Sequence, residues 1–224
     1  MIPIKVLVPS GVLGLGFDLE ALNNGVKNNP DIISIDGGST DSGPYSLGSG
    51  TSKYSRAAIK AEWKSLMIAR KKANVPLVIG SCGTCGTNGM VDWMENITIE
   101  LAEELNQNIK IAKLYCQQEK NFIKKNFQLR RIFPLTPAPM LNDQLIEEMT
   151  NIVALAGAEQ IQECINTGAE IILAGRTTDT AIISALPLMK GANPGSSWHG
   201  SKVVECGALC LSLIHISEPT RPTP

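Results

Sequence analysis

The chain has 224 residues, of which 43% are hydrophobic and 18% are charged, and its formal net charge is -1. This balance, with only 4% aromatic residues, excludes the basic, stacking surface by which proteins bind nucleic acid. No apolar run approaches the roughly 20 residues of a membrane span, and the first apolar residues are broken too soon by Pro to form a signal peptide. We therefore expect a cytoplasmic protein with reduced thiols and with neither nucleic-acid nor membrane partners.

Short apolar runs alternate with helical patterns along the chain, which is typical of parallel βαβ units. The runs lack polar alternation, as expected of strands that are covered on both faces. Strands are predicted at Lys5–Val8, Ile32–Ile35, Leu77–Ile79, Ile109–Lys113, Ile152–Leu155 and Glu170–Leu173. Helices are predicted at Phe17–Val26, Ser55–Lys72, Val91–Leu105, Gln117–Phe127, Asp143–Met149, Ala158–Asn166 and Thr180–Met189. The pattern predicts an α/β fold, a Rossmann-like three-layer sandwich with a mainly parallel sheet.

The last fourteen residues, 211–224, differ from the rest of the chain, because they have no period and contain three prolines near their end. They resemble a translated sequencing adaptor of the kind found at the ends of metagenomic genes. We interpret them as non-native and expect one domain over 1–210 that is incomplete at its C-terminal end. A native Pro-rich tail is the alternative. On the first interpretation, His199 is the only native histidine.

The six cysteines favour free thiols over a disulfide framework. Four of them lie in apolar stretches and are expected to be buried thiols, namely Cys116, Cys164, Cys206 and Cys210.

Ligands of open parallel sheets bind beyond the carboxyl ends of the strands, so the loops that follow the strands are the candidates for a site. After the first strand, Gly14 and Gly16 allow a tight turn and a close approach of the backbone to a ligand. The spacing departs from the dinucleotide fingerprint G-x-G-x-x-G. The loop therefore provides no secure nucleotide motif, and a plain β–α turn is the alternative.

The loop after the second strand, 36–50, is the densest in polar groups. It contains two carboxylates among glycines, which could bind an anion through backbone amides, coordinate a hard cation through Asp36 and Asp41, or supply a general base. A solvated linker is the alternative. We assign Asp36 and Asp41 as candidate catalytic or metal-binding residues, and as candidate substrate-binding residues Gly38, Ser39, Thr40 and Tyr45.

The loop after the third strand contains Cys82-x-x-Cys85. A structural zinc site would need a second ligand pair of this kind, which the sequence lacks. A redox dithiol would need a helix N-terminus, and the surrounding glycines are atypical of one. We favour an anion cradle in which Ser81, Thr84 and backbone amides bind a carboxylate or phosphate. Cys82 is also a candidate nucleophile, with a packed thiol as its alternative.

The loop after the last strand opens directly into a helix. Arg176 could pair with a carboxylate or phosphate, Thr177 and Thr178 could donate to a ligand, and Asp179 is a candidate acid, base or metal ligand. Helix capping alone is the alternative. His199 is a further catalytic candidate, although a lone histidine is more often structural.

Five motifs together resemble the N-terminal domain of the acyclic terpene utilisation (AtuA-like) family. The longest, Asp-Gly-Gly-Ser-Thr-Asp-x-Gly-Pro-Tyr-x-Leu-Gly-Ser-Gly, spans 36–50 and is specific, and the others support it. They are Gly-x-Gly-Phe-Asp at 14–18, Gly-Ser-Cys-Gly at 80–83, Gly-Arg-Thr-Thr-Asp at 175–179 and Glu-Cys-Gly-Ala at 205–208. The resemblance implies a bacterial, cytoplasmic protein of branched or terpenoid acid catabolism, and it supplies no catalytic set.

Two functions follow from these patterns. The first is an enzyme of lyase, hydratase or isomerase type that acts on a small carboxylate or its acyl-CoA ester. In it, Asp36, Asp41 or Asp179 moves the proton, with or without a divalent metal. The second is a non-catalytic binding or scaffold subunit of a catabolic complex. A homo-oligomer is compatible with either function.

Overall fold

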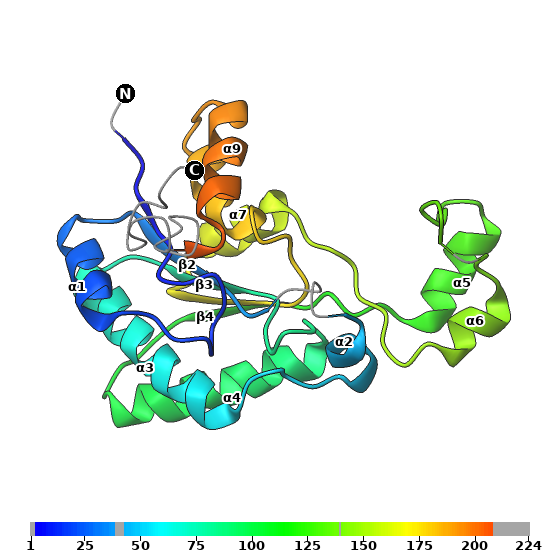
Figure 1. Cartoon of the computed structure of the whole chain (residues 1–224), viewed down its shortest axis with the longest axis horizontal. Helices are drawn as coiled ribbons and strands as arrows, with labels where there is room; N and C mark the ends of the chain where they lie inside the picture. The colour runs from blue at the N-terminus through cyan, green and yellow to red at the C-terminus, as the bar shows by residue number, and fades with distance from the viewer. Residues whose placement is uncertain (1–2, 39–42, 139, 208–224) are drawn as a thin grey trace, which may run out of the picture.

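The computed structural model describes residues 3–38, 43–138 and 140–207. Five parallel strands form one sheet in the order β1-β2-β3-β5-β4, with helices on both faces, so the predicted three-layer α/β sandwich is confirmed (Figure 1). The strands are β1 (Val6–Leu7), β2 (Ile32–Asp36), β3 (Leu77–Gly80), β4 (Ile111–Leu114) and β5 (Ile171–Ala174). The helices are α1 (Leu19–Lys27), α2 (Tyr45–Ser49), α3 (Arg56–Ala73), α4 (Asn88–Glu104), α5 (Lys120–Gln128), α6 (Asp143–Glu148), α7 (Ala158–Asn166), α8 (Ala181–Met189) and α9 (Pro194–Val204).

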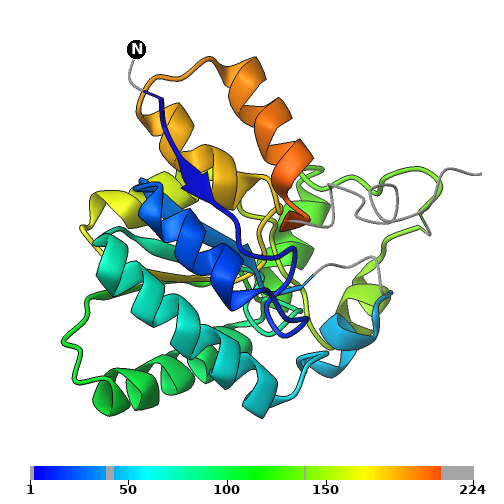
Figure 2. The same ribbon diagram turned by 60° about the vertical axis from the view of Figure 1, so that its left-hand side comes forward.

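The helices on the two faces of the sheet show where successive connections run in opposite directions. Helices α1, α3 and α4 pack on one face, and α7 and α8 pack on the other, with α9 lying against α8 (Figure 2). From β3 the chain crosses over β5 through α4 to reach β4, whereas from β5 it turns back through α8 over β3 and β2. The connections thus leave β3 and β5 in opposite directions, and the switch point at which such sheets bind ligands lies between their carboxyl ends.

One predicted strand, Ile152–Leu155, is wrong. This segment pairs with no strand of the sheet and runs past the carboxyl ends of β4 and β5. Ala154 donates its amide to the Cys116 carbonyl at 2.8 Å, and Ala156 donates to the Arg176 carbonyl at 2.9 Å. The backbone amides of this segment therefore form hydrogen bonds with loop carbonyls. A short apolar sequence alone does not distinguish such a segment from a strand of the sheet.

Helices α2 and α9 were not predicted, because both are rich in Gly and Ser, which have low intrinsic helix propensity. The start of α9 does carry a local signal. The Asn193 side chain accepts a hydrogen bond from the amide of Ser196, and Pro194 occupies the first helical position.

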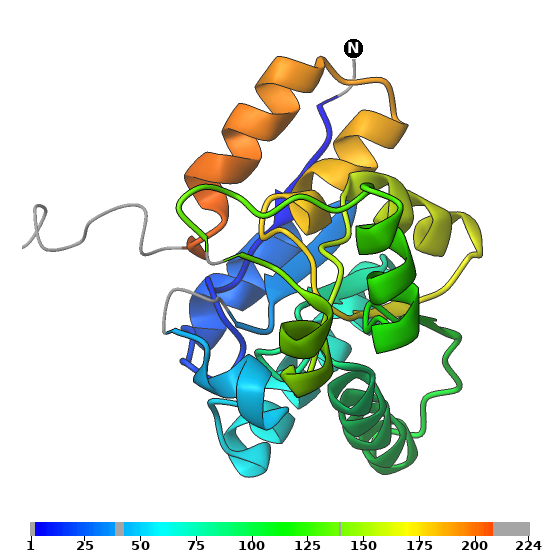
Figure 3. The same cartoon turned by 90° about the vertical axis from the view of Figure 1, so that its right-hand side faces the viewer.

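Helices α5 and α6 pack against each other in an arm that extends from the sandwich (Figure 1), and Figure 3 shows this arm from its outer side. Helix α5 has no buried residue, and the only buried residue of α6 is Ile146.

The cysteines follow the prediction with one exception. Cys116 and Cys164 are buried thiols as expected, but Cys206 is exposed because it lies at the surface just beyond the end of α9. Cys210 lies outside the described residues. No helix in the described ranges is both long and apolar enough to cross a bilayer.

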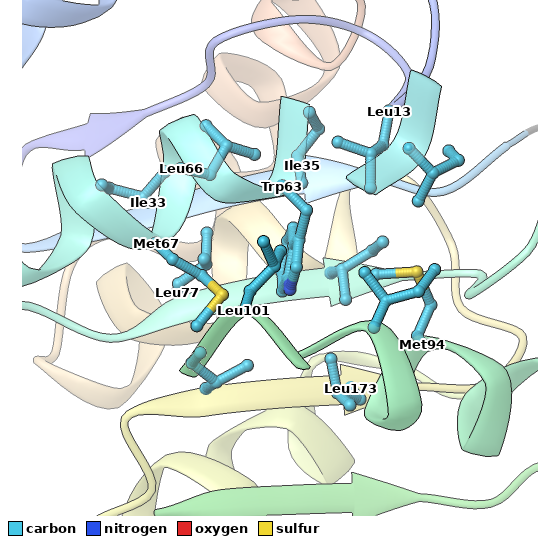
Figure 4. Packing of buried hydrophobic residues seen from close by; sticks show 14 of the residues in the cluster. Leu13, Ile33, Ile35, Trp63, Leu66, Met67, Leu77, Met94, Leu101 and Leu173 are labelled. Atoms are coloured by element: carbon cyan, nitrogen blue, oxygen red, sulfur yellow. The ribbon is translucent and has the colours of Figure 1, made fainter. Parts of the chain in front are cut away.

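The larger core lies between the sheet and the face formed by α3 and α4 (Figure 4). Trp63 of α3 is fully buried at its centre, and its indole Nε1 donates to Thr98 Oγ1 of α4 at 2.9 Å. The Thr98 hydroxyl in turn donates to the Met94 carbonyl at 2.7 Å. A buried polar group is tolerated here because every donor has an acceptor.

Replacing Thr98 with Val keeps the shape of the side chain but leaves the Trp63 N–H buried without an acceptor. We expect Thr98→Val to lower the free energy of unfolding by about 1–3 kcal/mol, measured by urea denaturation. Ile99→Val, at the neighbouring exposed position, is the control and should change it by less than about 0.5 kcal/mol. Equal stability of the two variants would contradict the role given to this hydrogen bond.

Candidate functional site

The carboxyl end of β2 presents a buried carboxyl group. Asp36 is the last residue of the strand and is 4% exposed. Its Oδ2 accepts the amide N–H of Gly38 at 3.0 Å, whereas its Oδ1 has no hydrogen-bond partner among the described residues. Burial raises the pKa of Asp36 well above its ordinary value of 3.8, and the nearby Asp179 carboxylate raises it further, against the opposing effect of the Arg176 guanidinium. The neutral, protonated form is therefore favoured.

Glycines allow the loop that follows Asp36 to lie directly on the loop that follows β3. The Gly37 amide donates to the Gly80 carbonyl at 2.7 Å, and a Cβ added at Gly37 would lie 2.5 Å from the Ser81 carbonyl oxygen. At Gly38, where φ is +141°, an added Cβ would meet Thr84 at 2.7 Å. No larger residue could keep this separation, so the close approach of the loops depends on these two glycines.

Arg176 joins three strand-end loops at the switch point of the sheet. It follows β5, it is buried, and its Nη1 donates to the carbonyls of Gly38 and Thr84, each at 3.1 Å. The guanidinium thus holds the β2 and β3 loops against the β5 loop and places a positive charge beside Asp36. The prediction that Arg176 also binds an anionic substrate stays a prediction.

The polar groups of the third loop are engaged within the protein. The amides of Ser81 and Cys82 donate to carbonyls at the end of β5, at 2.8 and 3.0 Å. The Ser81 hydroxyl lies 3.4 Å from the Thr177 carbonyl, and the Thr84 hydroxyl accepts the Lys53 amide at 3.1 Å and donates to the Gly37 carbonyl at 3.3 Å. Both hydroxyls therefore bind backbone groups of neighbouring loops, and the anion cradle remains untested.

Cys82 lies in surroundings that suit a packed thiol. It is fully buried, and burial raises the pKa of its thiol well above the ordinary value of 9.0, with a further contribution from Asp36. A nucleophilic cysteine needs the opposite shift. Cys85 is also buried, with its Sγ 3.5 Å from the Thr87 hydroxyl.

The glycine loop after β1 already holds an anionic group of the protein itself. The amides of Gly14 and Gly16 donate to the two carboxylate oxygens of Glu62, at 2.7 and 2.9 Å. Glu62 lies in α3, so the loop is fastened to that helix. Local sequence gives no sign of this contact, because Glu62 is an ordinary helical residue until the fold brings the loop to it.

Asp179 and its neighbours occupy the turn into α8. Asp179 is half-buried and lies close enough to Asp36 to influence its pKa. The Thr178 hydroxyl accepts the amide N–H of Ala181, the first residue of α8, at 3.2 Å. Thr177 is fully buried, and its Oγ1 has no partner among the residues that the structure describes.

Two predicted residues lie on exposed surfaces. Tyr45 begins α2 and is 78% exposed, and His199 is exposed on α9. Ser39, Thr40 and Asp41 lie outside the described residues, so the predicted metal pair of Asp36 and Asp41 is not tested. Within the described ranges, no three His, Cys, Asp or Glu side chains gather as metal ligands do.

Gly86 tests the close packing of the loops, because its φ is +65° and an added Cβ would lie 2.4 Å from the Arg176 backbone nitrogen. We expect Gly86→Ala to lower the free energy of unfolding by about 3 kcal/mol, measured by urea denaturation. The control is Gly89→Ala in α4, where an added Cβ meets nothing within 4 Å. That change should raise the free energy of unfolding by about 0.5 kcal/mol; similar losses in both variants would contradict the packing argument.

The pKa of Asp36 makes a second prediction. The native state binds the Asp36 proton more tightly than the unfolded state does. As the pH rises above 3.8, the unfolded chain therefore releases this proton first. The free energy of unfolding then falls with rising pH until Asp36 also ionises in the native state. Asp36→Asn removes that dependence. The free energy of unfolding of the variant should therefore rise relative to wild type as the pH rises above 3.8, until Asp36 ionises in the native state, in urea titrations at several pH values. A pH-independent difference would contradict the raised pKa.

Comparison with known proteins agrees with the motif resemblance. The family model described as Acyclic terpene utilisation family protein AtuA matches residues 46–208, which is more than half of the chain. No curated protein and no solved structure matches the chain significantly. The matched range includes the loops after β3 and β5, and with them Arg176 and Asp179. The chain therefore belongs to the acyclic terpene utilisation family.

Proposed function

We propose that this protein is an enzyme of branched or terpenoid acid catabolism that moves a proton on a small acid or its acyl thioester. Membership of the family gives a role in acyclic terpene utilisation. The reaction classes that need no redox cofactor, namely lyase, hydratase and isomerase chemistry, suit the site best. A cytoplasmic location is part of the same proposal.

The observation that supports this proposal is the buried carboxyl group of Asp36 at the carboxyl end of β2. An acid or base acts most effectively when its pKa lies near the working pH. Burial and the Asp179 carboxylate move the pKa of Asp36 upward from that of an exposed Asp. This carboxyl can hold a proton at a pH where other aspartates are ionised, and it can therefore both donate and accept one.

The two oxygens of Asp36 have different surroundings. Oδ2 is held by the Gly38 amide, and Oδ1 has no hydrogen-bond partner in the described part of the chain. In the proposed reaction, Asp36 in its ionised form takes a proton on Oδ1 from the carbon next to the substrate carbonyl. The C–H electron pair forms a double bond to the next carbon, and the group on that carbon leaves with its bonding pair. Asp36 then gives the proton to this leaving group and is ionised again.

Asp179 and Arg176 set the charge around this step. The half-buried Asp179 disfavours ionisation of Asp36, and the Arg176 guanidinium favours it. Arg176 is a positioning residue here, because its Nη1 holds the loops of Gly38 and Thr84 in place.

The test is turnover of branched and terpenoid acids, each offered as the free acid and as the coenzyme A thioester. Asp36→Asn should lower kcat/KM by about 10²–10⁴-fold while the protein stays folded by circular dichroism. Asp31→Asn is the matched control, since Asp31 lies before the amino end of β2 and pairs with Lys190; it should retain activity within about threefold. Full activity in Asp36→Asn would refute the proposal. Absence of turnover by wild type, with co-purification of a partner chain, would favour the scaffold function.

A further inference from the structure

The strand register places Asp36 beside Gly80 on the face of the sheet that α8 covers. Asp36, the last residue of β2, is paired with Gly80 of β3. Side chains two residues apart in a strand point to the same face, and the hydroxyl of Ser34 donates to the Ile182 carbonyl of α8 at 2.8 Å. The Asp36 side chain therefore points to the α8 side of the sheet, and a side chain at Gly80 would point the same way.

The hydroxyl of Thr177 fills the space that the glycine leaves beside Asp36. A Cβ added at Gly80 would lie 2.2 Å from Thr177 Oγ1 and 3.0 Å from the side chain of Ile182. Neighbouring strands of a sheet lie about 4.8 Å apart. The Thr177 hydroxyl is therefore about one strand spacing from the Asp36 side chain, so that one small group can contact both residues.

Both side chains carry an oxygen atom that has no hydrogen-bond partner in the described part of the chain. Thr177 is fully buried and Asp36 is 4% exposed, and the two atoms are Thr177 Oγ1 and Asp36 Oδ1. A buried polar atom without a partner lowers stability, and native proteins contain few of them. Two such oxygens, about one strand spacing apart, indicate a ligand atom that bonds to both.

The chemistry of the two oxygens favours water as this shared ligand. A hydroxyl can donate a hydrogen bond, and an ionised carboxylate can only accept one. A water molecule matches both groups, because it accepts from the hydroxyl and donates to the carboxylate. A hard cation would need about six oxygen ligands, and no group of three metal-binding side chains occurs within 3–38, 43–138 and 140–207.

Resting on the proposed function, we infer that Thr177 Oγ1 and Asp36 Oδ1 bind one water molecule between them, and that the reaction releases or adds this water. Thr177 is then a second catalytic residue beside Asp36, and the reaction is a dehydration or its reverse. An isomerisation would give the Thr177 hydroxyl no oxygen atom to hold.

In the direction of dehydration, the bonds balance as follows from the two side chains. Ionised Asp36 takes a proton on Oδ1 from the α-carbon, which is the carbon next to the substrate carbonyl, and the C–H electron pair forms a double bond to the β-carbon. The hydroxyl group on the β-carbon leaves with its bonding pair, while the Thr177 hydroxyl donates a hydrogen bond to its oxygen. Asp36 gives its proton to this group, so that one water molecule forms and Asp36 is ionised again.

Isotope incorporation tests the class of reaction. Wild type is incubated with 3-methylbut-2-enoic acid and with its coenzyme A thioester, in heavy-oxygen water and in deuterium oxide, and the products are analysed by mass spectrometry. We expect heavy oxygen on the β-carbon and deuterium on the α-carbon in equal amounts. Deuterium without heavy oxygen would overturn the inference and leave the proposed function standing. Absence of both labels would count against both.

The Thr177 hydroxyl is tested with a pair of variants. Thr177→Val removes it without breaking a hydrogen bond within the described residues, and should lower kcat/KM for hydration about 10²-fold. Thr177→Ser keeps a hydroxyl and should stay within about threefold of wild type. Ser34→Ala is the matched control, because it removes a buried hydroxyl on the same face that bonds to α8. This control should be less stable in urea and should keep kcat/KM within about threefold.

The variants also separate the two proposals. Full activity of Thr177→Val, with Asp36→Asn inactive, would overturn the inference and leave the proposed function standing. Full activity of Asp36→Asn would refute the proposed function, and the inference with it.

A crystal structure at high resolution tests the water without any turnover. In wild type we expect an ordered water about 2.7–3.0 Å from both Thr177 Oγ1 and Asp36 Oδ1, and in Thr177→Val we expect none. A direct hydrogen bond between the two side chains would overturn the inference, as would a separation too large for one water to reach both.

Discussion

One guanidinium group sets the geometry of the carboxyl edge of the sheet. Arg176 Nη1 is shared between the carbonyls of Gly38 and Thr84, so the loops after β2, β3 and β5 have a common centre. Such charge-assisted bonds are stronger than bonds between neutral groups, and burial shields these two from competing water. The glycines beside them permit the approach, and the position of the Asp36 carboxyl follows from both.

The position of the Arg176 guanidinium also explains how the carboxyl edge of the sheet can hold a buried carboxyl group in a stable fold. An isolated buried carboxylate would be costly, but Asp36 can remain neutral, receives the Gly38 amide on Oδ2 and faces a fixed positive charge. In the proposed reaction, the demands of folding and of proton transfer would coincide, because the surroundings that make ionisation of Asp36 costly also keep a proton on its carboxyl group. Asp179, which is half-buried, contributes its charge to this balance from the turn into α8.

Much of this arrangement could be predicted from sequence, because strand-end loops of a parallel sheet converge whatever their order. The alternation of apolar runs and helices indicates the sandwich, and the position of Asp36 directly after an apolar run predicts that it lies at a strand end. Other features depend on contacts between distant segments. Ile152–Leu155 has the composition of a strand, yet its amides pair with loops. Helix α9 has a sequence of low helix propensity and is held by packing and by its N-terminal cap. Nothing local distinguishes Glu62 from an ordinary surface residue.

The contact of Glu62 with the first glycine loop has a consequence for how this fold responds to ligands. In many sheets of this kind, the amides of such a loop await a diffusible phosphate. Here the anion is covalently part of the chain and is always present at high effective concentration. The two amides of the loop after β1 are thus already bonded within the chain. A diffusible anion would have to displace the Glu62 carboxylate to bind them, so this loop forms a wall of the site that the chain itself holds in place.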